Sequence, residues 1–323
     1  MPRYIRNTVI LAKVETTIGT DAVPTGAADA VLVSAMSINP LNAQNVSRDL
    51  MRGYFGGSEQ LVATAFVTVD FTVELAGSGA AATAPQWGDL LIGCGMAEAL
   101  LTTPGRVEYT PVSSALKTLT IYYHDDGVLH KLLGAMGTVK LSAKVGERPT
   151  LQFSFTALDG GISAAANASP TLTNWKTPPT MTKANVVDIT LGCTYAAGAI
   201  ASGTVYPSTG LDLDLGNTVA YTPLLSSDRI DISQREVTGS ASFDLTPAQE
   251  VSLMAVVKAN TVQSLGFTIG LSAGNKIILH APAVQLINPS KGETNGTRLI
   301  GYDLRLVPTA AGSGNDELRI VTQ

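Results

Sequence analysis

The residues of this chain that could carry out chemistry are few, and their spacing does not suit a catalytic or metal site. The tripeptide His124-Asp-Asp126 is the best candidate, because a histidine beside carboxylates can act in acid–base catalysis or bind a metal. Gly127 follows it directly, however, and Asp-Gly favours a tight hairpin turn. His130 and His280 are the only other histidines, and they do not complete the ligand spacing of a zinc motif. The sequence therefore predicts no metal site.

Motifs for binding nucleotides or supplying a nucleophile are also weak. The chain has no Gly-Lys-Ser/Thr phosphate loop, and Gly77-Ser-Gly79 is typical of a flexible turn. We also expect no nucleophile elbow of the hydrolase type. Cys94 and Cys193 are too few for a disulfide framework or a metal cluster. Cys94 follows Leu91 and Ile92 in an expected helix, which favours a buried thiol. We predict that the protein is not an enzyme and holds no cofactor.

Acidic and hydroxyl side chains recur at every second position in three expected strands, which makes one face of each strand polar. In residues 66–75, valines and Phe71 alternate with threonines and acids, and residues 237–245 repeat the pattern. Residues 211–215 alternate leucine with aspartate. The polar set is Asp70, Thr72, Glu74, Asp212, Asp214, Thr238, Ser240, Ser242 and Asp244.

The elements that position these residues occur twice along the chain. Residues 119–155 and 267–304 share the order of apolar positions and turn glycines, with 32 residues from Ile121 to Phe153 and 33 from Ile269 to Tyr302. A domain-sized internal repeat indicates two copies of one β-domain in tandem. A fused pair of this kind can occupy two positions in a symmetric ring.

Each copy also has one expected helix that follows its alternating strand. The first spans residues 85–95 and opens at a proline, and the second spans residues 246–258. Thr246 is the expected N-cap of the second helix, with Pro247 at N1 and Gln249 at the capping-box position. The fold class is therefore mainly β (α+β), with two tandem β-sandwich or barrel-like domains that each have one flanking helix.

The expected domain boundaries follow from composition. Residues 1–162 form the first copy, residues 163–185 form a linker rich in proline, serine and alanine, and residues 186–323 form the second copy. Residues 309–316 are rich in glycine and alanine and are expected to be a loose C-terminal tail.

Bulk composition gives further bounds on function. Charged residues make up 15% of the 323 residues and hydrophobic residues 45%, which fits a surface covered by identical neighbours or, equally, the small-residue bias of a GC-rich genome. A net charge of −5 disfavours a surface that grips nucleic acid. The N-terminus lacks a signal peptide and no run of 18 apolar residues occurs, so we expect a soluble protein without a membrane partner.

Five stretches of the first half carry a resemblance to a known family. They are Val14-Glu-Thr-Thr-Ile-Gly-Thr-Asp-Ala-Val-Pro-Thr-Gly26, Ala30-Val-Leu-Val33, Val73-Glu-Leu-Ala-Gly-Ser-Gly79, Pro85-Gln-Trp-Gly-Asp-Leu-Leu-Ile-Gly-Cys-Gly95 and Val107-Glu-Tyr-Thr-Pro111. Through these stretches the first half of the chain resembles the major tail tube proteins of long, non-contractile-tailed (siphovirus-type) bacteriophages. The second half matches this family more weakly, through its strand–helix–strand order.

The resemblance implies a structural virion protein that is assembled in the bacterial cytoplasm and forms stacked rings around a β-lined channel for DNA ejection. Single-domain members form hexameric rings, so a duplicated member would form a trimer with pseudo-hexameric symmetry. If the second half were an outer decoration, the ring would be a true hexamer. The implied partners are other copies of the chain, a tape measure protein, a tail terminator and distal tail proteins, with double-stranded DNA passing through unbound.

In such a tube the wall must not retain DNA, whose duplex carries a phosphate about every 1.7 Å of axis. A mildly acidic wall repels phosphate, so the polar strand faces are candidates to line the lumen. The alternative is that these acids coat an outer, solvated face. The lumen-lining candidates are Asp70, Thr72, Glu74, Asp212, Asp214, Ser240, Ser242 and Asp244.

Ring stacking needs exposed segments that reach the next ring. Residues 45–60 combine apolar and aromatic side chains with glycines and charges, and residues 221–229 are their counterpart in the second copy. An ordinary surface loop is the competing interpretation. The candidates for contact between rings are Arg48, Leu50, Met51, Arg52, Tyr54, Phe55, Leu224, Leu225 and Arg229.

Two other functions remain open at this point. A virion decoration protein or another surface-binding β-module would have a similar composition rich in serine, threonine and glycine. The inner tube of a contractile tail would share the fold, although the length and the duplication favour the non-contractile type.

Overall fold

Strands dominate the chain, which confirms the mainly β prediction. The computed structural model describes residues 2–309 and 314–323. The strands of the first half are β1 (Thr8–Val14), β2 (Ala30–Val31), β3 (Val33–Ser47), β4 (Gln60–Glu74), β5 (Met96–Thr102), β6 (Gly105–Pro111), β7 (Leu119–Asp125), β8 (Val128–Lys144) and β9 (Thr150–Ala164). The strands of the second half are β10 (Val186–Leu191), β11 (Thr194–Ala196), β12 (Ala199–Ala201), β13 (Thr204–Val205), β14 (Ser208–Asp214), β15 (Asn217–Pro223), β16 (Asp228–Arg235), β17 (Thr238–Phe243), β18 (Val262–Ile269), β19 (Ile277–Thr294), β20 (Thr297–Leu306) and β21 (Arg319–Thr322).

Neighbouring strands pair antiparallel in a corresponding order in the two halves. In the first half the order is β2-β1-β7-β8-β9-β4-β3. In the second half it is β13-β10-β18-β19-β20-β17-β14. The last pair in each series carries an irregularity near its start, between Val33 and Ala35 in β3 and between Ser208 and Leu211 in β14.

Two strand pairings join the halves. β14 pairs with the C-terminal part of β8, with Asp212 opposite Ser142 and Asp214 opposite Lys140. β21 lies between β19 of the second half and β6 of the first half. The β14–β8 joint makes β3-β4-β9-β8-β14-β17-β20-β19 a continuous run of eight strands.

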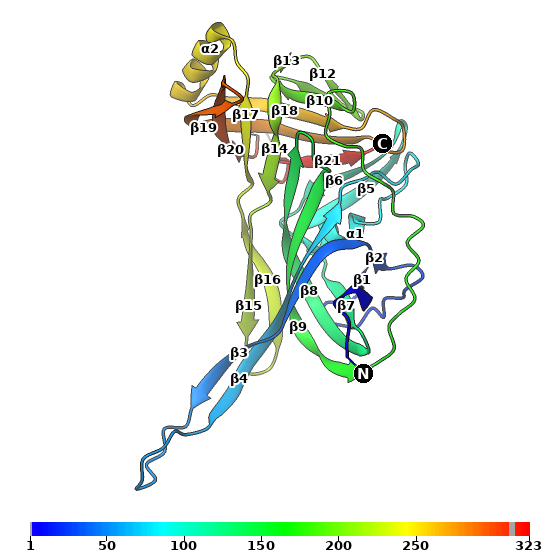
Figure 1. The fold of residues 1–323 in the computed structure, drawn as a ribbon, viewed down its shortest axis with the longest axis vertical. Coiled ribbons are helices and arrows are strands. Elements are labelled where there is room, and N and C mark those ends of the chain that lie inside the picture. Colours follow the sequence, from blue (N-terminus) through cyan, green and yellow to red (C-terminus); the bar gives the residue numbers. More distant parts are fainter. Residues whose placement is uncertain (1, 310–313) are drawn as a thin grey trace.

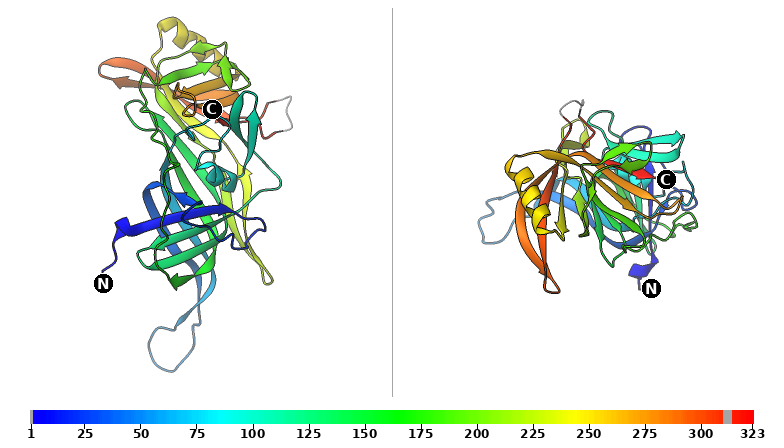
Figure 2. Two further views of the ribbon diagram at one scale, coloured as in Figure 1. Left: turned by 90° about the vertical axis from the view of Figure 1, so that its right-hand side faces the viewer. Right: turned by 90° about the horizontal axis from the view of Figure 1, so that it is seen from above.

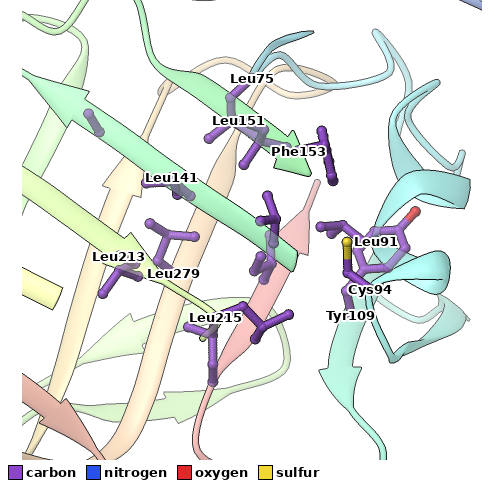
Figure 3. Close-up of a cluster of buried hydrophobic side chains, with 14 of the residues drawn as sticks. Leu75, Leu91, Cys94, Tyr109, Leu141, Leu151, Phe153, Leu213, Leu215 and Leu279 are labelled. Atoms are coloured by element: carbon purple, nitrogen blue, oxygen red, sulfur yellow. The ribbon is translucent and has the colours of Figure 1, made fainter. Parts of the chain in front are cut away.

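One face of this run is buried in a hydrophobic core that extends through both halves. Figure 3 shows Leu141 and Leu151 of the first half near Leu213, Leu215 and Leu279 of the second. Each large apolar side chain buried in this way stabilises the fold by about 1.5–3 kcal/mol.

Aromatic rings fill the part of the core within the first half. The ring centroids of Phe71 and Phe153 lie 5.8 Å apart, and those of Phe71 and Phe155 lie 5.7 Å apart. Stacked and tilted pairs of this kind add to the stabilisation from burial alone.

The two predicted helices form, with different accuracy at their ends. α1 (Gly88–Gly93) is shorter than the expected 85–95 segment, because Pro85 belongs to a preceding turn in which its carbonyl accepts a hydrogen bond from the Gly88 amide at 2.9 Å. A Cβ atom at Gly93 would come within 2.6 Å of Cδ1 of the buried Leu119, so a larger residue there would displace that side chain from the core.

α2 (Pro247–Lys258) begins where the sequence predicts. Thr246 is its N-cap and forms a full capping box with Gln249, as expected. A short 3₁₀ helix, η1 (Ile5–Asn7), precedes β1.

The segment between the halves crosses the surface as an extended strap (Figure 1). β9 continues to Ala164, and residues 165–185 form neither helix nor strand. Two apolar side chains anchor the strap. Trp175 donates a hydrogen bond from Nε1 to the carbonyl of Ala30 at 3.0 Å, and Met181 is buried with its amide 2.9 Å from the carbonyl of Glu147. Of the tail expected at 309–316, residues 310–313 lie outside the described residues, and the chain beyond it forms β21.

Two hairpins leave the eight-stranded run in the same direction, away from α2 (Figures 1 and 2). The outer parts of β3 and β4 form the longer one, which extends beyond the body of the molecule and which we call the long arm (residues 39–66). β15 and β16 form the shorter one, which we call the short arm (residues 217–235).

Candidate functional site

The polar side chains of the eight-stranded run gather on one face, because directly opposed residues of antiparallel strands point to the same side of a sheet. Asp70 is paired with Ser37 on one side and Ser154 on the other. Asp212 is likewise paired with Ser142 and Ser240. We call this surface, opposite the core, the wall face.

The sequence-predicted lumen candidates come together on the wall face from both halves of the chain. Seven of them occupy strand positions whose registers connect through β9 and β8. The eighth, Asp244, is exposed directly after β17. The seven are Asp70, Thr72, Glu74, Asp212, Asp214, Ser240 and Ser242.

The wall face also carries basic residues that the sequence analysis missed. Lys140 Nζ lies 3.1 Å from Asp214 Oδ2, and Lys144 Nζ lies 3.2 Å from Asp212 Oδ2. Ser142 donates a hydrogen bond to Asp212 Oδ1 at 2.6 Å. The lysines are more than half exposed, so each pair contributes about 0–1 kcal/mol to stability. The alternation of Lys140, Ser142 and Lys144 was the signal that could have revealed them.

The acids of the wall face differ in how far their charge is compensated. Arg148, in the β8–β9 turn, lies 2.8 Å from Glu74. Asp70 and Asp244 form no ion pair within the described residues. The face is therefore a mixture of paired charges, hydroxyl groups and a small surplus of free carboxylates, without a cluster of free cations along the described strands.

The predicted contact residues lie at the tips of the two arms. On the long arm, Met51 and Phe55 are fully exposed, and Leu50 and Tyr54 are 46% and 71% exposed. Arg48 and Arg52 turn back to pair with Glu59 at the base of the loop.

On the short arm, Leu225 is fully exposed and Leu224 is 51% exposed. Arg229 pairs with Asp231 at 2.5 Å. Apolar side chains that a single chain leaves in water at the ends of two hairpins are typical of a contact surface for another molecule.

The histidine–aspartate motif has a structural role. Asp126 and Gly127 both have positive φ, of 42° and 95°, in the turn between β7 and β8, which confirms the predicted hairpin. Asp126 accepts a hydrogen bond from the Tyr4 amide at 2.6 Å, and Arg3 pairs with Asp125, so the turn holds the N-terminal segment.

The remaining reactive groups do not assemble into a site. No group of three metal-ligating side chains occurs among residues 2–309 and 314–323. Burial raises the pKa of the Cys94 thiol well above its ordinary value, which fits the predicted buried cysteine. The pentapeptide Gly270-Leu-Ser-Ala-Gly274 has the letters of a nucleophile elbow, but it is the loop between β18 and β19, with no helix after it.

Comparison with known proteins identifies the family of the chain. In the part of the chain that the structure describes, neither helix is long and apolar enough to cross a membrane. No curated protein matches the chain significantly. A model of the family described as phage tail tube protein matches residues 5–320, nearly the whole chain. The chain therefore belongs to the phage tail tube protein family, whose members are structural components of the virion tail rather than enzymes.

Proposed function

We propose that this chain is the tube subunit of a non-contractile, siphovirus-type tail. In this proposal three chains close into a pseudo-hexameric ring, rings stack into the tube, and DNA leaves the virion through the channel. The observation that carries the proposal is the eight-stranded run, which joins both halves and has one buried face and one polar face.

The trimer follows from treating the chain as two tandem domains, residues 1–162 and 186–323, joined by a linker at 163–185. Corresponding strand orders support this division, as does the helix that follows β4 in one half and β17 in the other. The β14–β8 joint would then be one side-by-side contact between neighbouring domains of a ring. Three chains, each supplying two domains, would close such a ring.

The wall face has the chemistry that a DNA channel requires. Duplex DNA binds surfaces that offer many free lysines and arginines, and it gains affinity by releasing counterions. On the wall face, Lys140, Lys144 and Arg148 are each within 3.2 Å of a carboxylate. Their charge is therefore compensated, and the free carboxylates of Asp70 and Asp244 would repel phosphate. The lumen-lining role of these residues is part of the proposal.

The arm tips complete the proposed assembly. The long arm extends beyond the body, so its exposed Met51 and Phe55 could reach the adjacent ring, and the exposed Leu225 of the short arm would add to this contact. A tape measure protein within the tube, and a terminator and a distal tail protein at its ends, are the partners that this position implies.

Electron microscopy of the purified chain tests the assembly directly, because the proposal predicts hollow rings stacked into tubes. Separate particles or a coat on another surface would instead favour a decoration protein.

The channel role is tested in phage that carry Asp70→Lys together with Glu74→Lys. We expect tails to assemble but DNA ejection to fall, because free cations on the wall would retain phosphate. The matched control is Asp70→Asn with Glu74→Gln, which removes charge without adding cations and should leave ejection close to normal. Normal ejection by the lysine variant would contradict the channel assignment.

A further inference from the structure

The eight-stranded run ends in two backbone edges that have no strand partner within the described residues. At one end, residues 35–39 of β3 pair only with β4. At the other end, residues 290–294 of β19 pair only with β20. Unpaired edges of this length are templates for pairing with another chain.

The molecule contains a completed example of the contact that these edges could make. At the β14–β8 joint, residues 210–214 pair antiparallel with residues 140–144, with Leu211 opposite Ala143 and Leu213 opposite Leu141. Leu211 and Leu213 are 0% and 5% exposed there. The joint thus shows how the edge of one half fits the long strand of the other.

The open edges correspond to the strands of that joint. β3 corresponds to β14, because Met36 lies opposite Phe71 of β4 just as Leu211 lies opposite Ala241 of β17. By the same comparison Ile38, opposite Val69, corresponds to Leu213, opposite Gly239.

β19 corresponds to β8. The N-terminal part of each pairs with the strand before it, and the C-terminal part of each pairs with the strand after it. The halves differ at the N-terminal part, where β8 also pairs with β9 whereas β19 pairs with β21. Near the end of these strands, Lys291 lies opposite Ile300 where Leu141 lies opposite Leu151. Residues 290–294 of β19 are therefore the counterpart of residues 140–144 of β8.

We propose that β3 of one chain pairs antiparallel with the C-terminal part of β19 of a second copy, in the register of the β14–β8 joint. This places Met36 opposite Glu293, Ser37 opposite Gly292 and Ile38 opposite Lys291. The pairing rests on the proposed function, since it is the contact that closes the ring, and it adds the partner surface and its register.

The partial burial of β3 supports β19 of a second copy as its partner. Met36 and Ile38 are half-buried and pack against the core, whereas their counterparts Leu211 and Leu213 are fully covered by β8. Lys291 is exposed, and its amine lies 3.0 Å from Glu250 of α2. The alkyl stem of Lys291 would cover Ile38 while the amine keeps its partner.

The joint between chains would differ chemically from the joint within the chain. On the wall face it brings together Ser37 and Asn39 with Ser290 and Gly292, where the internal joint has two ion pairs. A charged, glycine-containing strand such as residues 290–294 is also a poor template for uncontrolled pairing. This keeps the edge soluble until the apolar β3 edge of another copy meets it.

Cysteine cross-linking in assembled tubes tests the register. Ser37→Cys with Gly292→Cys places thiols on opposed residues, and Gly292 has room for a side chain. Asn39→Cys with Ser290→Cys is a second pair in register, and Ser142→Cys with Asp212→Cys is the positive control within the chain. Ala35→Cys with Ser290→Cys is the negative control, four residues out of register.

We expect both pairs in register to give covalent trimers on a non-reducing gel. The pair out of register should give at least about tenfold less product, because a disulfide does not form when the Cα atoms are more than about 7 Å apart. Two results would overturn the register alone. In one, rings form and the control within the chain oxidises, but neither pair in register gives a cross-link. In the other, all pairs cross-link equally. Wild-type chains that form no rings would contradict the proposed function as well.

Discussion

The long arm and the short arm occupy corresponding places in the two halves but have different surroundings. The long arm extends past the body and leaves Met51 and Phe55 in water (Figure 1). The short arm lies against the first half, where the rings of Tyr221 and Phe66 are 5.2 Å apart. The same type of hairpin is thus exposed in one half and pinned in the other.

Two side chains at the base of the short arm hold it against the rest of the chain. Asn217 donates hydrogen bonds from Nδ2 to the carbonyls of Cys94 and Gly137, at 2.6 and 2.9 Å. Arg235 pairs with Glu317 at 2.6 Å and donates a hydrogen bond to the carbonyl of Val112 at 3.0 Å. The comparison shows that contacts within the chain hold the base of the short arm and leave only its tip exposed, whereas most of the surface of the long arm stays free for another molecule.

The largest effect is expected from the tip of the long arm. Replacing Met51 and Phe55 together by serine removes two fully exposed apolar side chains, so the free energy of unfolding should change by no more than about 0.5 kcal/mol. Tube formation should nevertheless fail or stop at single rings, because truncated contact residues weaken association strongly. Tube length by electron microscopy and a thermal melt measure the two effects.

Leu225→Ser on the short arm is the comparison for this variant. We expect shorter tubes rather than none, since one exposed side chain is lost instead of two. Tubes of normal length from the double variant would show that the free arm does not hold rings together.

The next largest effect is expected when the ion pair at the base of the short arm is removed. Arg235→Ala leaves the carboxylate of Glu317, whose side chain is 7% exposed, without its partner, so the free energy of unfolding should fall by about 3–5 kcal/mol. Chemical denaturation measures this change.

Arg229→Ala on the same arm is the matched control. Its pair with Asp231 is more than 40% exposed on both sides, which limits the loss to about 1 kcal/mol. Equal losses for Arg235→Ala and Arg229→Ala would mean that the short arm is not pinned at its base.

A smaller effect is expected on the stability of the fold at acid pH, where a buried histidine of each half resists protonation. Burial lowers the pKa of His124 in the first half. In the second half burial, reinforced by the positive charge of Arg319, lowers the pKa of His280 from 6.5 to about 4. The unfolded chain then takes up the proton first as pH falls, so stability is unaffected above pH 6.5 and is lost between pH 6.5 and 4. The loss should approach about 3 kcal/mol.

His280→Phe isolates this contribution, because phenylalanine can still stack on Tyr195, whose ring centroid lies 5.3 Å from that of His280. The variant should be less sensitive to acid over this range than the wild type. Parallel pH profiles of stability for the two proteins would show that His280 titrates normally.

Local patterns in the sequence predicted the local structure well. The alternation in residues 66–75 predicted which side chains of β4 are buried, and the spacing of Thr246 and Gln249 predicted the start of α2. Both depend on neighbours within a few residues. The sequence also placed the acids of the wall face correctly relative to their own strands, although their role in a channel stays a prediction.

Features that depend on distant partners were not predictable in this way. Lys140 and Lys144 meet Asp214 and Asp212 only because β8 pairs with a strand about 70 residues further along the chain. Trp175 anchors the strap although the surrounding composition is typical of a free linker. The pairing of β21 with β6 likewise joins the C-terminal strand to a strand of the first half, and no local pattern relates the two.

The β14–β8 joint also has a consequence for how a ring would assemble. Two bodies that associate lose translational and rotational freedom, at a cost of roughly 4–15 kcal/mol for each event. In a trimer of tandem domains every second contact forms as the chain folds, so only half of the contacts carry this entropic cost. The subunit would thus begin assembly with two neighbouring positions already in alignment, which favours closure of the ring over open, misaligned chains.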